Sequence, residues 1–599
     1  MDDRGWSSLP GLFFAQAERL GDKPFLWHKQ DGAYRPLSWR QTAEKVGQLA
    51  RGLHALGIAA GDRVVLVAEN RPEWLIADIA IMTLGAITVP TFTSNTAADH
   101  RHILTHSGAK AAIVSGGGVA KRLLAAALEA PDLSFIVAME PLDIAQRPAA
   151  RLLSWAEALS HGGDGDGEAV AALLPRLTRD AVCCFIYTSG TGGTPKGVML
   201  THGSILANCR GAYHLLEAFN LGDEVFLSFL PLSHAYEHTA GQFFPISLGG
   251  QIYYAESVEK LMDNMLEARP TIMTAVPRLY EIMLQRIQRG LAKTTGARRR
   301  LFDLAVALGR QRLERPGSLT PTQRLLDLVA GLMVRRKLRQ RFGGRLKAWV
   351  SGGAALNPEV GTFFIALGLP LLQGYGQTEA SPVIACNPPG RIKLHAVGPP
   401  LDGVEVRIAA DGEILVRGEL VMKGYWRDPE ATAKTIRDGW LHTGDIGRFD
   451  TDGYLEITDR KKDIIVLTGG DNVSPARVEG YMILEPEIHQ AMVEGDGRPH
   501  LVALVVPERD VVLAWARRHG CPPELSTLAD DPEFVRSLTP AVERVNAKLS
   551  PIERVRRFAV ASEPFTIENE MLTGSLKIRR HKIRAAHGAT LERLYEKGG

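Results

Sequence analysis

Cysteine is scarce in this chain, which has five in 599 residues. No two of them form a C-x-x-C pair, and two are adjacent inside an apolar stretch. This usage argues against a disulfide framework and against a zinc site, and it is typical of a reducing compartment. The N-terminus has no basic segment followed by an apolar run, so a secretory signal is not expected. We therefore expect a cytoplasmic protein.

Long apolar runs are absent as well. The most apolar candidate, residues 74–89, is interrupted by Asp78, Thr83, Gly85 and Thr88. A helix with these interruptions is typical of a buried core and not of a membrane span. No internal repeat or long low-complexity tract is evident either.

Acidic residues are nearly missing from residues 286–347. This segment holds 17 Lys and Arg and three acids, a local formal charge of +14, so the remainder carries −11 of the net +3. Leucines recur at helical spacing in both halves of the segment, at Leu301, Leu304, Leu308, Leu325, Leu328 and Leu332. We expect basic amphipathic helices that are broken near Pro316 and Pro321.

This basic segment has two interpretations. Anionic membrane surfaces attract such helices, which would place the protein peripherally on the inner face of a membrane. A solvated helical hairpin packed on its own domain is the alternative. Nucleic acid binding is not expected, because only Phe302 and Phe342 interleave the arginines.

The length of the chain exceeds one ordinary core, and 45% hydrophobic with 23% charged residues is typical of a soluble globular protein. Strand-like and helix-like runs alternate in the first part, which predicts an α/β fold with a mostly parallel, layered sheet. Residues 398–458 hold short runs with D-G turns and predict an antiparallel, barrel-like unit. Charge density rises at residues 459–462. We expect an N-terminal domain over 1–458, with the basic insertion 286–347, a hinge at 459–462, and a smaller mobile α+β domain over 463–599.

The most informative stretch is AVCCFIYTSGTGGTPKGVMLTH, which begins at residue 181. Residues 181–187 read as a buried strand, and Thr201 reads as a helix N-cap. Between them, residues 188–197 hold four glycines, three threonines, a serine, a proline and Lys196. Backbone N–H groups of such a loop can surround phosphate oxygens. The spacing fits neither a P-loop nor a dinucleotide-binding fingerprint.

Six motifs together carry a family resemblance. YTSGTGGTPKG is followed in order by GYGQTE, LHTGDIG, DRKKDIIV, GGDNVSPARVE and LTGSLKIRR. The set resembles the adenylate-forming superfamily of acyl- and aryl-CoA synthetases, luciferases and peptide-synthetase adenylation domains. The basic insertion is similar to that of the long-chain fatty acyl members. Gly192 departs from the family's usual threonine, so phosphate contacts would rest more on backbone amides.

The resemblance implies a ligase that converts a fatty carboxylate and ATP to acyl-AMP and then transfers the acyl group to CoA. The implied phosphate loop comprises Thr188, Ser189, Gly190, Thr191, Gly192, Gly193, Thr194 and Lys196. The implied adenine site comprises Gly353, Ala354, Ala355, Gly374, Tyr375 and Gly376, with Tyr375 as the stacking face. Asp445 and Arg460 would hold the ribose.

The resemblance also implies which residues act on the reacting groups. Glu379, next to Thr378, would ligate Mg²⁺, because a lone carboxylate beside phosphates is repelled unless a hard cation lies between them. His234 follows a strand end and would border the carboxylate pocket; a structural histidine is the alternative. Sequence alone does not choose among the cations near the C-terminus, but the family pattern selects Lys577 as the one that bridges carboxylate and α-phosphate.

For the second half-reaction, the resemblance implies rotation of the small domain about Lys462, which would present Gly469 and Gly470 to the pantetheine of CoA. Three alternatives stay open: a fatty acyl-AMP ligase that loads a carrier protein, an aryl or medium-chain CoA ligase, and a non-catalytic membrane-associated binding module. The compact hinge region favours CoA as acceptor. A homodimer is left open by the sequence.

Overall fold

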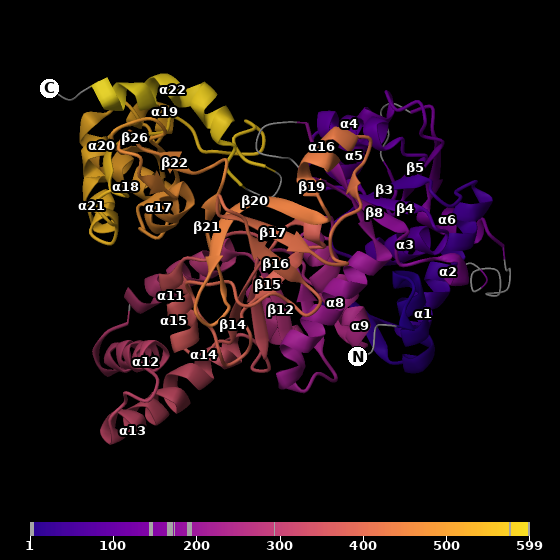
Figure 1. The fold of residues 1–599 in the computed structure, drawn as a ribbon, viewed down its shortest axis with the longest axis horizontal. Coiled ribbons are helices and arrows are strands. Elements are labelled where there is room, and N and C mark those ends of the chain that lie inside the picture. The colour runs from indigo at the N-terminus through magenta and orange to yellow at the C-terminus, as the bar shows by residue number, and fades with distance from the viewer. Residues whose placement is uncertain are drawn as a thin grey trace.

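The computed structural model describes residues 5–142, 148–163, 172, 174–188, 194–292, 294–573 and 577–596. A large N-terminal body carries three sheets, and a smaller C-terminal domain, yellow in Figure 1, sits above one of them. This architecture confirms the predicted α/β class with a large mixed domain and a smaller second domain.

One eight-stranded sheet has the order β18-β9-β8-β4-β3-β5-β6-β7. Its strands are β3 (Arg63–Val67), β4 (Ile87–Pro90), β5 (Ala111–Val114), β6 (Phe135–Ala138), β7 (Arg151–Ser154), β8 (Val182–Thr188), β9 (Lys196–Thr201) and β18 (Gly424–Tyr425). Strands β3 to β8 pair in parallel, whereas β9 runs antiparallel to β8. The predicted strand before the glycine-rich loop is therefore confirmed, and β9, a strand that was not predicted, follows the loop and pairs with β8.

The other eight-stranded sheet has the order β15-β14-β13-β12-β10-β11-β1-β2. Its strands are β1 (Pro24–Gln30), β2 (Ala33–Ser38), β10 (Val225–Ser228), β11 (Gln251–Tyr254), β12 (Ile272–Ala275), β13 (Ala348–Ser351), β14 (Leu371–Gly376) and β15 (Val383–Cys386). The strands from β14 to β1 pair in parallel. The loops that follow β10, β13 and β14 therefore leave the sheet at one edge, where ligands of open parallel sheets bind.

Helices cover these two sheets. They are α1 (Leu9–Leu20), α2 (Trp39–Ala55), α3 (Pro72–Thr83), α4 (Ala97–Ser107), α5 (Gly117–Ala127), α6 (Trp155–Ser160), α8 (His202–Leu216), α9 (Phe244–Leu248), α10 (Leu261–Ala268) and α15 (Pro358–Ala366). Helix α3 is buried along almost its whole length, as expected for a core helix. It ends at Thr83, however, and Val89 belongs to β4, so the prediction of one helix over 74–89 is wrong. The chain turns at Gly85, where φ is +69°.

The third sheet is antiparallel throughout, as predicted for residues 398–458. Its strands are β16 (Glu405–Ile408), β17 (Glu413–Arg417), β19 (Ile436–Arg437), β20 (Trp440–Phe449) and β21 (Leu455–Arg460), with α16 (Pro429–Thr435) beside them. Strand β21 continues to Arg460, so the last strand of the large domain enters the proposed hinge directly.

The basic insertion is helical. It begins within α11 (Pro277–Ala292) and continues through α12 (Gly296–Glu314), α13 (Pro321–Ala330), the π-helical turn η5 (Gly331–Arg335) and α14 (Arg336–Arg341). The break between α12 and α13 spans Pro316, as predicted. Gly309 of α12 packs against α15, and a Cβ there would stand 2.2 Å from the Ala366 carbonyl oxygen. In Figure 1, α13 forms the lower left tip of the molecule.

The C-terminal domain holds β22 (Ile465–Val466), β23 (Asn472–Val473), α17 (Pro475–Met482), β24 (Ile488–Glu494), β25 (Leu501–Pro507), α18 (Arg509–His519), α19 (Leu525–Leu528), α20 (Pro532–Ser537), α21 (Thr539–Asn546), β26 (Val555–Val560) and α22 (Arg580–Glu596). Its contacts with the large domain include Asn357 Nδ2 donating to the Gly480 carbonyl at 3.2 Å. Within the described part of the chain, no helix combines the length and apolar character that crossing a membrane requires.

Candidate active site in the cleft between the domains

A cavity of about 620 Å³ lies where the small domain faces the large one. The large domain lines it with Thr188, Thr194, Lys196, Glu379, Tyr425 and Thr435, and the small domain with Lys462, Asp463, Ile464, Ile465, Asp496, Arg580, His581 and Arg584. Cations from both domains thus face one space that is large enough for a polyanion.

The ends of the glycine-rich loop lie at this cavity. Strands β8 and β9 pair Thr188 with Lys196, which holds the two ends of the loop together. The Lys196 Nζ atom lies 2.9 Å from Asp428 Oδ2 and 5.2 Å from the ring centre of Tyr425. The remaining predicted loop residues, Ser189, Gly190, Thr191, Gly192 and Gly193, lie outside the described residues. The helix expected after the loop is confirmed, with the Thr201 hydroxyl accepting from the Ser204 amide.

Glu379 lies in the short helical turn η6 (Thr378–Ala380), which follows β14. The chain can turn there because Gly376 has no side chain: a Cβ would stand 1.8 Å from the Pro382 carbonyl oxygen. The Tyr425 hydroxyl donates to Glu379 Oε1 at 2.9 Å. This contact engages one carboxylate oxygen and orients the group at the cavity wall. A half-buried carboxylate that faces a phosphate-sized space fits a hard divalent cation such as Mg²⁺.

Asp445 and Arg460 stand opposite each other on β20 and β21. Arg460 Nε lies 3.3 Å from Asp445 Oδ1, and the Tyr375 hydroxyl donates to Asp445 Oδ2 at 2.6 Å. Burial raises the pKa of Asp445, whereas Arg460 and the Tyr375 hydroxyl lower it. The structure therefore brings together three of the residues predicted to hold the nucleoside.

His234 follows β10 and is half-buried. Its Nδ1 accepts from the Tyr236 amide at 3.2 Å, so the proton of the neutral ring resides on Nε2. Burial and the charge of Lys577 lower the pKa of His234 to about 4. The imidazole is therefore neutral near pH 7, with Nε2–H available as a donor.

Lys577 brings the small domain into this site. The segment is closed locally by the Thr573 amide donating to the Lys577 carbonyl at 2.8 Å and the Lys577 amide donating to Thr573 Oγ1 at 3.0 Å. The side chain of Lys577 is exposed to solvent, yet protein atoms surround its ammonium group closely enough to desolvate it in part. That crowding and Arg460 lower its pKa, while Asp445 and Glu379 raise it. Lys577 therefore interacts electrostatically with four predicted site residues: Arg460, Asp445, Glu379 and His234.

The predicted adenine-site residues lie at the ends of β13 and β14. Gly353, where φ is +82°, Ala354 and Ala355 are exposed in the loop after β13. Gly374, Tyr375 and Gly376 are the last three residues of β14, and Thr378 begins the turn η6. Gly469 and Gly470 form an exposed turn between β22 and β23 and do not line the cavity in this arrangement.

A π-helix, η4 (Glu237–Phe243), follows His234 in the chain and carries two buried titratable groups, Glu237 and His238. Ser228 Oγ and Thr274 Oγ1 each donate to the Glu237 carboxylate at 2.6 Å, and burial raises the pKa of Glu237 to about 7. His238 Nε2 lies 2.8 Å from Asp78 Oδ2, with neither side chain exposed. These contacts fix the helix that follows His234, and the His238 amide donates to the His234 carbonyl at 2.9 Å.

Sequence reasoning missed several cavity residues. Tyr425 lines the cavity and contacts Glu379, and Asp428 lies beside the cavity and contacts Lys196, yet each lies far from its partner in the chain. The sequence D-P-E, which starts at Asp428, is typical of a helix N-terminus, and Asp428 caps α16. No comparable local pattern marks Tyr425. Arg580, one of the cations near the C-terminus among which the sequence does not choose, also lines the cavity, and its Nη2 donates to the Glu479 carboxylate at 2.7 Å.

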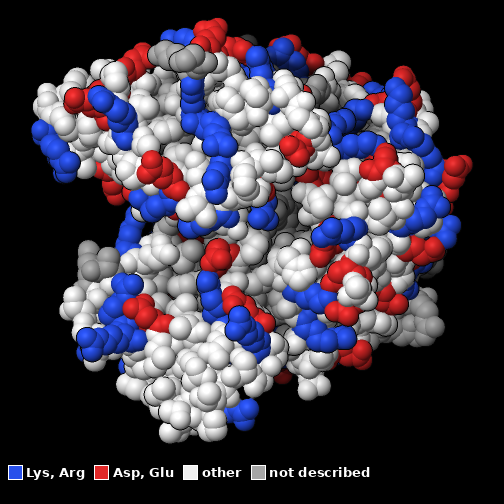
Figure 2. Space-filling model, turned by 60° about the vertical axis from the view of Figure 1, so that its left-hand side comes forward, with Lys and Arg blue, Asp and Glu red and all other residues white. Residues whose placement is uncertain are grey.

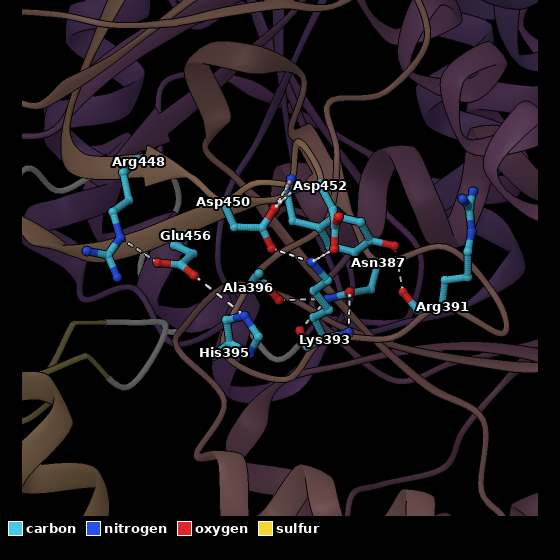
Figure 3. Close-up of polar contacts among 10 residues, drawn as sticks. Asn387, Arg391, Lys393, His395, Ala396, Arg448, Asp450, Asp452 and Glu456 are labelled. Atoms are coloured by element: carbon cyan, nitrogen blue, oxygen red, sulfur yellow. Dashed lines mark hydrogen bonds and ion pairs between the residues drawn. The ribbon is translucent and has the colours of Figure 1, made fainter. Parts of the chain in front are cut away.

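A cluster of potential metal ligands lies away from the cavity, at His395, Asp450 and Glu456. Figure 3 shows that these carboxylates are already engaged by cations: Arg448 Nε donates to Glu456 at 2.7 Å, and Lys393 Nζ contacts Asp450. These contacts tie the loop around residue 393 to the β20–β21 hairpin.

The comparisons with known proteins agree with this geometry. The AMP-binding enzyme family matches residues 13–426, and the AMP-binding enzyme C-terminal domain matches residues 462–598. The long-chain-fatty-acid–CoA ligase FadD15 of Mycobacterium tuberculosis is 33% identical over 577 residues, which are 95% of this chain and 93% of that protein. The peroxisomal long chain acyl-CoA synthetase 7 of Arabidopsis thaliana is 31% identical, with 97% of this chain and 84% of that protein covered. The adenylation domain of a carboxylate reductase from Mycobacterium chelonae has the same fold, with a TM-score of 0.74 at 23% identity over 98% of this chain and 91% of that one.

Proposed function

The chain belongs to the AMP-binding enzyme family, and from this premise we propose that it is a long-chain fatty acid–CoA ligase. A carboxylate oxygen of the fatty acid attacks the α-phosphorus of ATP, and the bond to the bridging oxygen breaks, which gives acyl-AMP and pyrophosphate. The thiolate of CoA then attacks the acyl carbonyl, and AMP leaves, which gives acyl-CoA.

The observation that carries this proposal is the position of Lys577. It comes from the small domain, yet its charge acts on Asp445, Glu379 and His234 of the large domain. A cation at that place offsets the repulsion between a carboxylate and the α-phosphate as they meet, and this attraction is greatest in the transition state. The depressed pKa of Lys577 would recover when two anions bind beside it.

The nucleotide would bind along the cavity wall of the large domain. Asp445 would accept hydrogen bonds from the ribose hydroxyls in place of that from Tyr375, with Arg460 completing the pair. Lys196 would exchange Asp428 for the β- and γ-phosphates, because a doubly charged phosphate is the stronger anion. Glu379 would hold Mg²⁺, which neutralises the phosphate charge when bound.

His234 would act as a hydrogen-bond donor to the carboxylate substrate. Its Nε2–H is the free donor of the neutral ring, and its low pKa keeps it from competing with Lys577 as a second charge. A neutral donor orients the carboxylate without lowering its nucleophilicity as much as a second cation would.

CoA would enter after a rotation of the small domain. The exposed turn at Gly469 and Gly470 then replaces Lys577 at the site, and the lack of side chains leaves room for pantetheine. Lys462, exposed two residues after the end of β21, is the proposed pivot.

Pyrophosphate release with palmitate and ATP tests the proposal. A CoA ligase gives one slow turnover without CoA and many with it. A fatty acyl-AMP ligase gives one turnover in both cases until a carrier protein is added. Release of no pyrophosphate under any of these conditions contradicts both functions.

A further inference from the structure

Helix α13 and the turn η5 expose apolar side chains to solvent. Of the eleven large apolar side chains exposed among the described residues, six lie on this one stretch: Leu325, Leu326, Leu328, Val329, Leu332 and Met333. Leu325, Leu328 and Leu332 are 63%, 61% and 57% exposed. Spacings of three and four residues place most of them on one outward stripe, which we call the leucine face (Leu325, Leu328, Val329, Leu332 and Met333).

The opposite side of the same helix buries charged groups. Arg335 and Asp327 form an ion pair in which the side chains are 6% and 12% exposed. Arg335 Nε also donates to the Ala366 carbonyl at 2.9 Å, and its Nη2 donates to the Ala305 carbonyl at 3.0 Å. These bonds fix the rotation of the helix about its axis, so the leucine face cannot turn inward without breaking them. This helix therefore reverses the usual amphipathic arrangement: its inner side carries a buried ion pair, and its solvent side carries leucines.

Basic residues surround the leucine face. Those exposed on or near the helix are Arg315, Arg324, Arg336, Lys337, Arg339 and Arg341. Arg336 and Lys337 lie one turn beyond Leu332 and Met333. The acids of residues 286–347 are each held in ion pairs, Asp303 with Arg299, Glu314 with Arg310, and Asp327 with Arg335 and Arg312. Figure 2 shows this lower lobe as a largely white surface with blue side chains at its margin.

We propose that the leucine face is a docking surface for an anionic lipid bilayer. The leucines would lie among the acyl chains just below the headgroups, and the long stems of the arginines and lysines would reach the lipid phosphates. An apolar stripe bordered by cations is complementary to this partner in both polarity and charge. This contact does not depend on the ligase activity and can be measured without it.

A second copy of the chain fits the surface less well. Two leucine faces brought together would also bring together two segments of local charge +14, and their acids are already paired. Like charges around an apolar contact oppose self-association, most of all at low salt.

Vesicle flotation with the full-length protein tests this proposal. Phosphatidylcholine vesicles are compared with vesicles that also contain phosphatidylglycerol. The test variant is Leu325→Ser/Leu328→Ser/Leu332→Ser, and the matched control is Leu128→Ser/Leu266→Ser, which removes exposed leucines elsewhere. A second variant, Arg336→Gln/Lys337→Gln, removes charge only. Adenylate formation from a soluble short-chain acid checks that each variant is folded.

We expect the wild-type protein to float with the anionic vesicles only. The triple leucine variant should lose binding by about tenfold or more, and the charge variant should bind less tightly and depend less on salt. The control should bind like wild type. Equal binding by the triple variant and wild type, or equal binding to both kinds of vesicle, overturns the proposal. So does a lipid-free wild-type dimer that the triple variant converts to a monomer, because the face would then be a self-interface.

Discussion

Replacing Glu237 by glutamine should stabilise the protein above neutral pH and have little effect in acid. In the folded chain the Glu237 carboxyl is wholly buried, and its pKa is about 7, against an ordinary value of 4.5. Its two partners are hydroxyl groups, which can accept from an amide as well as donate to it, so glutamine fits the same contacts. The substitution therefore removes one titratable group and keeps its hydrogen bonds.

The sign and size follow from proton linkage. The folded state holds the proton more tightly than the unfolded state, so this group favours folding in acid, and that advantage is lost as pH rises from about 4.5 to 7. The complete loss is about 3 kcal/mol. The stability difference between Glu237→Gln and wild type should therefore grow by roughly that amount between acid and mildly alkaline pH.

Thermal unfolding across this pH range provides the assay. The melting temperature of the variant relative to wild type should rise by about 3 °C from the acid end to the alkaline end, since a cooperative unit of this size has a large unfolding entropy. Glu405→Gln, a change at an exposed glutamate, should show no such trend. A variant difference that stays constant with pH, or that shrinks as pH rises, refutes the reasoning.

Three other changes test the cavity. Tyr425→Phe removes the donor to Glu379, so kcat/KM for MgATP should fall about tenfold with little change in the KM for fatty acid, and an unchanged MgATP dependence would count against it. Asp428→Asn keeps the helix cap but frees Lys196, so the KM for ATP should fall by up to about fivefold, whereas a rise would mean that Asp428 orients the lysine productively. Lys462→Pro should impair thioester formation more than adenylate formation, measured as acyl-CoA and pyrophosphate, and equal loss of both argues against the pivot.

Much of the fold could be predicted from local patterns. The strand before the glycine-rich loop, the cap at Thr201 and the break near Pro316 depend on residues close together in the chain, where turn and cap chemistry is legible. The helix over 74–89 failed at its end because an apolar run of this kind does not reveal where a helix passes into a buried strand. Gly85 was the signal that a turn intervenes.

Site residues that lie in the family motifs could be predicted from the resemblance. Site residues that lie outside those motifs and meet only through the fold could not. Asp445 and Arg460 meet because β20 and β21 pair, and Lys577 joins them from the other domain. Tyr425 lies 46 residues from Glu379, and no local pattern marks it as a partner. Likewise, the periodicity of Leu325 and its neighbours predicted an apolar stripe but not that this stripe faces outward, since that depends on where Arg335 is anchored.

The rate of acyl-adenylate formation by Lys577→Ala, measured as pyrophosphate released in a single turnover without CoA, tests the central claim most directly. Lys582→Ala is the matched control, because Lys582 is a nearby cation whose partner is Glu570 and which the proposed chemistry does not use. The account predicts a loss of at least about a hundredfold for Lys577→Ala and none for the control. Adenylate formation by Lys577→Ala at the wild-type rate would contradict it.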